Sequence, residues 1–344
     1  MERSVKKSSR ATLVAAAVSI LALPACGAAD GAASDDGGAL NIAVLASSSQ
    51  NGYNQAVYEG VRKAVEASGQ DVELKLLDGQ FDSNTQLSQM QNVTSGDDYD
   101  GVVVVPNDGV SLAAAFPLSS DVPVVTVLNP IGPDIDTMTP QVDGVVSTVA
   151  VSPSAAAEKQ AEGVLEHCAD IDPCKVVELV GNLSATLDVA RKDSYDEVLS
   201  TAANIEVVSA VEGQYDRDTS LSAISNVLQA HPDIDVILSN ADQQTSGAVI
   251  ALQNAGIDPA SLYLTGGGGT EDAVAAVRAG TWKADYINFP VSMGEAAAEQ
   301  LLAAIAGEEV TEVVDADALG GDVEPYATAE TLATTPDFTG EWNG

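Results

Sequence analysis

Side chains that could catalyse a reaction or bind a metal ion are few in this sequence. The 344 residues include three cysteines and two histidines, namely Cys26, Cys168, Cys174, His167 and His231. Their spacing supplies no set of four metal ligands of the usual kind, so no metal site is predicted. Neither a Gly-x-Ser-x-Gly nor a His-Glu-x-x-His motif occurs. We therefore predict that the protein is not an enzyme and needs no cofactor.

The four-glycine run at 266–269 is the other stretch whose composition suggests a site. A glycine-rich turn before a helix can hold a phosphate group, but this run lacks the lysine of a phosphate-binding loop. Close backbone packing beside a ligand cleft is the alternative. Thr270 follows the run and is placed to cap a helix predicted over 271–279.

An internal repeat organises most of the chain that must position such residues. Residues 79–93 (GQFDSNTQLSQMQNV) match residues 213–227 (GQYDRDTSLSAISNV) at eight positions, with a shift of 134. The register extends in both directions, because the apolar run 41–45 lies over 175–179, and 102–104 lies over 236–238. The chain therefore contains two copies of one strand–helix–strand–helix–strand unit.

Both copies alternate short β-branched runs with stretches of helical period, which is typical of an open α/β sheet. Strands are predicted at 40–46, 72–77, 101–106, 122–128, 145–151, 175–180, 205–211, 235–239, 262–265 and 284–288. The predicted fold class is α/β, with two similar doubly wound parallel-sheet lobes, a hinge and an interlobe cleft. Ligands bind beyond the carboxyl ends of parallel strands, so both lobes should offer such an edge to the cleft. Lobes that merely pack, with no ligand between them, are the alternative.

The two predicted lobes exchange segments near the C-terminus. We assign 40–150 and 290–311 to the N-terminal lobe, and 151–289 and 312–335 to the C-terminal lobe. An alanine-rich helix at 292–306 returns to the first lobe, and 336–344 forms a tail. About 305 ordered residues suit two domains of ordinary size.

Residues 1–25 have the layout of a bacterial export signal, in which four basic residues precede the short apolar stretch 11–22. Leu23, Ala25 and Cys26 resemble a lipobox, where cleavage before the cysteine leaves a thiol that carries lipid. An ordinary secretory signal with a chance cysteine is the alternative. Residues 26–39 read as a flexible tether of Gly, Ala, Ser and Asp. The prediction is an extracytoplasmic domain that Cys26 anchors to the outer face of the cell membrane.

Export also bears on the two other cysteines. If Cys26 carries lipid, Cys168 and Cys174 remain, six positions apart, and an exported protein is expected to join them in a disulfide.

The charge of the chain excludes one class of partner. The sequence has 14 basic and 51 acidic residues, and cleavage before Cys26 would leave 10 against 50, a net charge of −40. Such a field repels nucleic acid, so no nucleic-acid partner is predicted. We expect a monomer.

Signal, lipobox and doubled lobes together resemble the extracytoplasmic solute-binding proteins of ABC importers, specifically the ribose-binding-like sugar group of type I periplasmic binding proteins. The resemblance covers nearly all of 40–310. Its motifs are Asn-Gly-Tyr-Asn at 51–54, Val-Pro-Asn-Asp at 105–108, Val-Pro-Val-Val-Thr at 122–126, Ala-His-Pro-Asp at 230–233 and Asn-Ala-Asp at 240–242. It implies capture of one small sugar or polyol between lobes that close by hinge motion, followed by docking on a membrane permease.

The resemblance also implies a set of ligand-binding residues. These are Asn51, Tyr53, Asn54, Asn107, Asp108, Asn129, Arg191, Tyr215, Asn240, Asp242 and Asn288. Aromatic rings would pack on the C–H faces of a sugar, and amides would bond its hydroxyls. Which of Asn240 and Asp242 faces the cleft stays open. As alternatives, the two tyrosines fill the core, Arg191 is a solvated helix residue, and Asn107 and Asp108 only start a helix.

Three departures from the family pattern bear on specificity. Leu128 and Asn129 replace an Asp-Arg pair, Gly268 replaces an aspartate, and Asn54 replaces an aromatic residue. Charged hydrogen bonds worth about 1.5–3 kcal/mol each would be missing. We therefore expect a pocket less charged than a pentose or hexose site, suited to a small polyol, a modified sugar or a non-sugar such as a small aromatic acid. A sensor for a membrane signalling partner is the alternative to transport.

Overall fold

The computed structural model describes residues 38–96 and 98–344. The predicted signal peptide, Cys26 and most of the predicted tether lie outside these residues. The first repeat copy contains β1 (Leu40–Ala46), α1 (Gly52–Ser68), β2 (Val72–Asp78), α2 (Ser83–Val93), β3 (Gly101–Val104), α3 (Gly109–Leu112), β4 (Val124–Leu128) and β5 (Val145–Ala150). The predicted strand 101–106 therefore ends two residues early.

The second copy follows in the same order. It contains α4 (Pro153–Cys168), β6 (Cys174–Val180), α5 (Thr186–Leu199), β7 (Ile205–Glu212), α6 (Arg217–Ala230), β8 (Val236–Ser239), α7 (Asp242–Asn254), β9 (Tyr263–Gly267), α8 (Glu271–Arg278) and β10 (Ala284–Tyr286). The chain ends with α9 (Pro290–Ala306), β11 (Val313–Asp315), β12 (Tyr326–Thr328) and α10 (Ala329–Leu332). A disulfide joins Cys168 at the end of α4 to Cys174 at the start of β6, as predicted.

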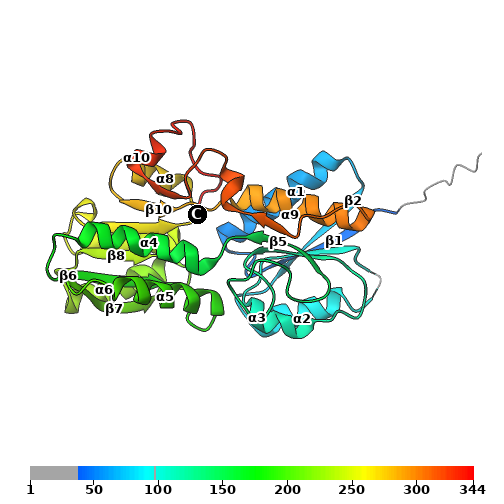
Figure 1. Ribbon diagram of the computed structural model, residues 1–344, viewed down its shortest axis with the longest axis horizontal. Coiled ribbons are helices and arrows are strands. Elements are labelled where there is room, and N and C mark those ends of the chain that lie inside the picture. Colours follow the sequence, from blue (N-terminus) through cyan, green and yellow to red (C-terminus); the bar gives the residue numbers. More distant parts are fainter. Residues whose placement is uncertain (1–37, 97) are drawn as a thin grey trace, which may run out of the picture. The chain divides into compact units, whose positions relative to one another are not determined.

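Two six-stranded sheets form the centres of two lobes (Figure 1). The strand orders are β11-β5-β4-β3-β1-β2 and β12-β10-β9-β8-β6-β7. Within the described residues every strand pair is parallel except β10 with β12. Each sheet buries apolar residues on both faces, for example Ile42 and Leu45 of β1 in two different clusters. The predicted fold class, two doubly wound α/β lobes, is confirmed.

Helix α9 returns to the first lobe, as predicted, and lies beside α1 (Figure 1). The two helices approach so closely that a Cβ atom on Gly60 would lie 1.9 Å from the carbonyl oxygen of Val291, and one on Gly294 would lie 2.1 Å from that of Val57. These glycines therefore allow the close helix packing that closes the first lobe.

The predicted boundary between the lobes near residue 312 differs from the structure. Residues 313–315 form β11, which pairs with Thr148–Ala150 of β5 and extends the first sheet. Strand β12 pairs with β10 of the second sheet, so the chain crosses between the lobes after β11 and before β12. The assignment of 312–335 wholly to the C-terminal lobe was therefore wrong for β11, because three residues at a sheet edge suffice to pair.

The repeated loops are built alike. Gln80 and Phe81 have φ angles of 56° and 52°, and Gln214 and Tyr215 have 57° and 56°. Two consecutive residues at positive φ, neither of them glycine, are uncommon, and both copies of the repeat contain such a pair. Asp82 and Asp216 then cap α2 and α6 by accepting from the backbone N–H groups three residues on, at 2.6 and 2.7 Å.

No helix in the part of the chain that the structure describes has the length and apolarity needed to span a membrane.

Candidate ligand-binding cleft

A cavity of about 100 Å³ lies at the carboxyl ends of strands from both sheets. Eight predicted ligand-binding residues line it: Asn51, Tyr53, Asn54, Asn107, Arg191, Tyr215, Asn240 and Asn288. The lining also includes residues that the sequence analysis did not select, chief among them Phe81, Leu128, Asn182, Leu187, Asp188, Gln214, Gln243 and Trp342. Both copies of the repeat thus contribute to one cavity.

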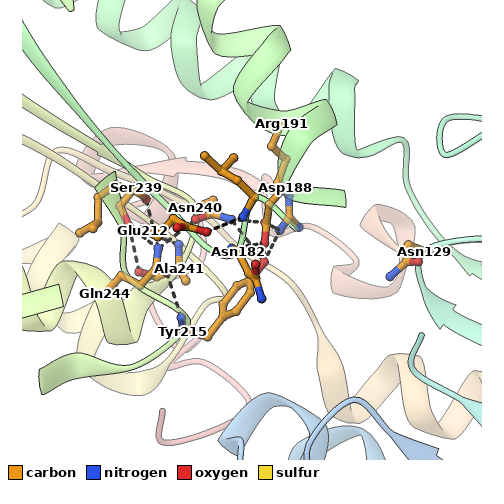
Figure 2. Close-up of polar contacts among 12 residues, drawn as sticks. Asn129, Asn182, Asp188, Arg191, Glu212, Tyr215, Ser239, Asn240, Ala241 and Gln244 are labelled. Atoms are coloured by element: carbon orange, nitrogen blue, oxygen red, sulfur yellow. Dashed lines mark hydrogen bonds and ion pairs between the residues drawn. The ribbon is translucent and has the colours of Figure 1, made fainter. Parts of the chain in front are cut away.

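Asp188 is the centre of a polar network on the second-lobe side of the cavity (Figure 2). Its carboxylate, in a residue that is 1% exposed, accepts from the Tyr215 hydroxyl at 2.5 Å and from the Asn240 amide at 2.9 Å. It also accepts from the backbone N–H of Asn182 at 2.6 Å and lies 3.4 Å from the Arg191 guanidinium. These donors fix the carboxylate and hold the arginine against the cleft.

Tyr215 is fixed by hydrogen bonds at its backbone N–H as well as at its hydroxyl. Its backbone N–H donates to Oε1 of Gln244 at 3.0 Å, and Nε2 of Gln244 donates to Oδ1 of Asn240 at 2.9 Å (Figure 2). Burial, reinforced by the charge of Asp188, raises the pKa of the Tyr215 hydroxyl well above its usual range. The hydroxyl therefore stays protonated and acts as a donor.

Amides dominate the first-lobe side. Oδ1 of Asn51 accepts from the backbone N–H and the side-chain amide of Asn54, both at 3.2 Å, and so caps α1. Oδ1 of Asn54 accepts from the backbone N–H of Ser47 at 3.0 Å. The Asn107 amide donates to the Ser83 hydroxyl at 2.8 Å. These hydrogen bonds fix the orientations of the three amides.

Aromatic rings enclose the cavity from three parts of the chain. The rings of Phe81 and Tyr215, one from each lobe, stack with centroids 6.1 Å apart and planes 18° from parallel. Tyr53 meets Trp342 edge to face at 5.7 Å. Leu128 adds an aliphatic wall from a left-handed backbone position at φ 76°, a sparsely populated conformation that is often found at functional sites.

Three predicted ligand-binding residues do not line this cavity. Asp108 caps α3 and accepts from the Thr186 hydroxyl of the other lobe at 3.3 Å. Asn129 is fully buried, donates to the carbonyl oxygen of Pro106 at 3.2 Å, and stands apart from the polar network (Figure 2). Both residues follow the end of a strand, but their side chains form hydrogen bonds with nearby backbone groups instead of lining the cavity.

Asp242 is the third. Its carboxylate accepts from the backbone N–H of Thr270 at 2.8 Å and adjoins Asp285, which accepts from the N–H of Gly269 at 3.1 Å. It therefore orders the glycine run, while Asn240 faces the cavity. Burial and the charge of Asp242 raise the pKa of Asp285 well above its usual range, so this pair holds a proton.

The charged side chains of the cavity lining are Asp188 and Arg191, while Leu128 and Gly268 line it without charge, and the expectation of a pocket less charged than a pentose or hexose site stays a prediction. Two residues that were not predicted, Phe81 and Asp188, could have been found from the repeat. The 134-residue shift aligns them with Tyr215 and Asn54, which were both predicted to bind the ligand. Trp342 has no counterpart in the repeat.

Among residues 38–96 and 98–344, no group of three His, Cys, Asp or Glu side chains is arranged to hold a metal ion.

Fold and cleft together define a two-lobed solute-binding protein of the type I periplasmic class. A family model described as the periplasmic binding protein domain matches residues 42–309, and the chain belongs to this family, in its ribose-binding-like group. Members of the family are found outside the cytoplasm and bind solutes, so the prediction that the chain is not an enzyme is confirmed.

Curated relatives are distant but cover most of the chain. A ribose import binding protein of Bacillus subtilis is 24% identical over 80% of this chain and 85% of its own length. A xylitol-binding protein of Mycolicibacterium smegmatis is 27% identical over 83% of this chain and 77% of its own length.

Solved structures share the fold. A Mycobacterium smegmatis protein in complex with β-D-fucofuranose has a TM-score of 0.73 at 20% identity, covering 87% of this chain and 95% of that one. A solute-binding protein of an ABC transporter from Bacillus halodurans, with bound myo-inositol, has a TM-score of 0.73 at 19% identity, covering 87% and 98%.

Proposed function

We propose that this protein captures a small sugar or polyol between its lobes and delivers it to the permease of an ABC importer. The observation that carries the proposal is one cavity that combines aromatic rings from both lobes with an amide-rich rim and the Asp188–Arg191 pair. A sugar presents C–H faces to rings and hydroxyls to amides and carboxylates, so this lining matches both parts of its surface.

The size of the cavity supports a small ligand. Its volume of about 100 Å³ is below the roughly 300–1,000 Å³ of pockets for drug-sized molecules, which favours one sugar ring or a short polyol over a disaccharide. Relatives named for ribose and xylitol, and structures with β-D-fucofuranose and myo-inositol bound, support the same class.

Thermal melting of the soluble chain from Ala28 onward tests binding. The panel holds ribose, arabinose, fucose, allose, xylitol, myo-inositol and small aromatic acids. A ligand that binds the folded state alone adds about 2.7 kcal/mol at a hundredfold excess over Kd, so one sugar or polyol should raise the melting temperature by several degrees. A shift with aromatic acids only, or with none of the panel, would refute the sugar proposal. Loss of uptake of the same sugar on gene deletion then separates transport from sensing.

We further propose that the mature chain is a monomer anchored by lipid at Cys26 to the outer face of the cell membrane. The lipobox at 23–26 and the polar tether support this arrangement. Metabolic labelling with a fatty acid should mark the native chain and not the Cys26→Ser variant. An unlabelled native chain that is released into the medium would refute the anchor.

A further inference from the structure

The last residues of the chain complete the ligand cavity. We propose that Trp342 is a ligand-contacting residue that belongs to neither repeat copy, and that residues 340–344, termed here the C-terminal strap, hold it in place by binding both lobes. The inference rests on the proposed function, since it concerns the same cavity.

Trp342 is packed between groups from both lobes. Its indole Nε1–H donates to the carbonyl oxygen of Gly268 in the second lobe at 2.7 Å, and its ring meets Tyr53 of the first lobe. The side chain is only 6% exposed, yet it lines the cavity. A Cβ atom on Gly268 would lie 2.9 Å from the indole ring, so glycine at this position makes room for it.

The C-terminal strap is fixed on either side of Trp342. The Glu341 carboxylate accepts from the backbone N–H groups of Val291 and Ser292, at 2.9 and 3.1 Å, and from the Ser292 hydroxyl. It thereby satisfies free donors at the start of α9 in the first lobe, where a negative charge is favourable.

The opposite side of the C-terminal strap binds the second lobe. The carbonyl oxygen of Trp342 accepts from the backbone N–H of Glu271 at 2.9 Å, at the start of α8. Figure 1 places the C-terminus where the two lobes meet, and a Cβ atom on Gly52 would lie 2.8 Å from the main chain of Gly344. The C-terminal strap thus joins the first turns of α1, α8 and α9 around one indole ring.

These contacts define what Trp342 can offer a ligand. Its only polar hydrogen is committed to Gly268, so a ligand meets apolar ring surface. Together with Tyr53 this wall suits a molecule with a continuous C–H face, such as a sugar ring or a cyclitol, whose hydroxyls reach the Asp188 network on the other side.

Tryptophan fluorescence and affinity test the inference together. The other tryptophan, Trp282, is 4% exposed in the core of the second lobe, so Trp282→Phe leaves Trp342 as the single indole. Acrylamide should quench the emission of the folded, ligand-free variant far less than the emission of the same variant unfolded in urea. The panel member that stabilises the native chain should then change the emission. Trp342→Ala should weaken binding of that sugar by about tenfold or more, and Trp342→Phe by less.

The outcomes separate the two claims. If no panel sugar stabilises the native chain, the proposed function fails, and quenching still decides whether Trp342 is enclosed. Quenching equal to that of the unfolded chain overturns the inference. So does a Trp342→Ala variant that is destabilised but binds the sugar as tightly as the native chain, because that result means a structural role alone. Glu341→Ala keeps the indole and removes one anchor of the C-terminal strap, and it should lower affinity less than Trp342→Ala.

Discussion

The two repeat copies share a backbone but divide the chemistry of the cleft between them. The 134-residue shift places Asn54 on Asp188, Val57 on Arg191 and Phe81 on Tyr215. Asn54 and Asp188 both accept a backbone N–H from the loop before their helix, at 3.0 and 2.6 Å. The second lobe, however, carries a carboxylate, a guanidinium and a hydroxyl where the first has an amide, an aliphatic side chain and a plain ring.

The two copies therefore share a backbone frame and differ in the polarity and charge of their matched side chains. Phe81 is 37% exposed and contributes only its ring, whereas the Tyr215 hydroxyl enters a network of four polar groups. A ligand between the lobes therefore meets amides and rings on one side and ion-paired groups on the other. Substitutions that make one copy resemble the other test this division.

The largest effect is expected from Asp188→Asn, which gives the second lobe the side-chain type of Asn54. Loss of the charge leaves Arg191, whose side chain is 14% exposed, without its partner, so the cost should lie toward the lower end of the range of about 3–5 kcal/mol for breaking a buried pair. Urea unfolding should show this loss of stability, and sugar binding should weaken at the same time. The matched control is Asp193→Asn, on the exposed face of the same helix, which should leave both unchanged. Equal effects from the two variants would contradict the role of Asp188.

An effect of intermediate size concerns Glu178 in β6, whose counterpart in β1 is Val44. Both residues are buried, and burial raises the pKa of Glu178 to about 7, although the Lys192 amine 3.3 Å away lowers it. The folded state therefore binds a proton that the unfolded state has already lost, so stability falls as pH rises from about 4.5 through about 7.

Glu178→Gln removes this titration. The variant should be more stable than the native chain at pH 8, by up to about 3 kcal/mol, and the gain should shrink by pH 4. Urea unfolding at the two pH values measures the difference, with Glu197→Gln on the exposed face of α5 as the control. A gain of the same size at both pH values would show that the carboxyl of Glu178 does not titrate as stated.

The smallest effects compare the stacked rings directly. Tyr215→Phe makes the second copy resemble the first and removes the hydrogen bond to Asp188, which should cost about 1.5–3 kcal/mol in stability and ligand affinity combined. The reciprocal change, Phe81→Tyr, adds a hydroxyl at a partly exposed ring and should change stability by less than about 0.5 kcal/mol. Melting curves with and without the bound sugar measure both. If the two changes cost the same, the copies do not divide the chemistry as described.

Much of the fold could be predicted because its signals are local. Runs such as 102–105 are apolar and β-branched, and parallel strands buried on both faces need that composition. Strand β11 carries only a short form of this signal, because Val313 and Val314 are too few to predict a strand and only the pairing with β5 reveals it.

The candidate site was predictable where a residue both follows a strand and faces the cleft. Asn107 and Asn240 meet both conditions, whereas Asn129 follows β4 but turns to the carbonyl oxygen of Pro106. That choice depends on side-chain direction, which the sequence pattern does not contain. Trp342 lies far along the chain from Tyr53 and Gly268, and only tertiary contacts join them.

The position of Trp342 also bears on the order in which the molecule can assemble. The first lobe needs α9 and β11, which follow the whole second repeat copy, and the second sheet needs β12, which follows β11. Neither lobe is therefore completed by one continuous stretch of chain, and the full cavity lining forms only when residues 290–342 have docked. Contacts between residues so far apart in sequence are formed slowly in folding, so the ligand cavity should be among the last parts of the molecule to form.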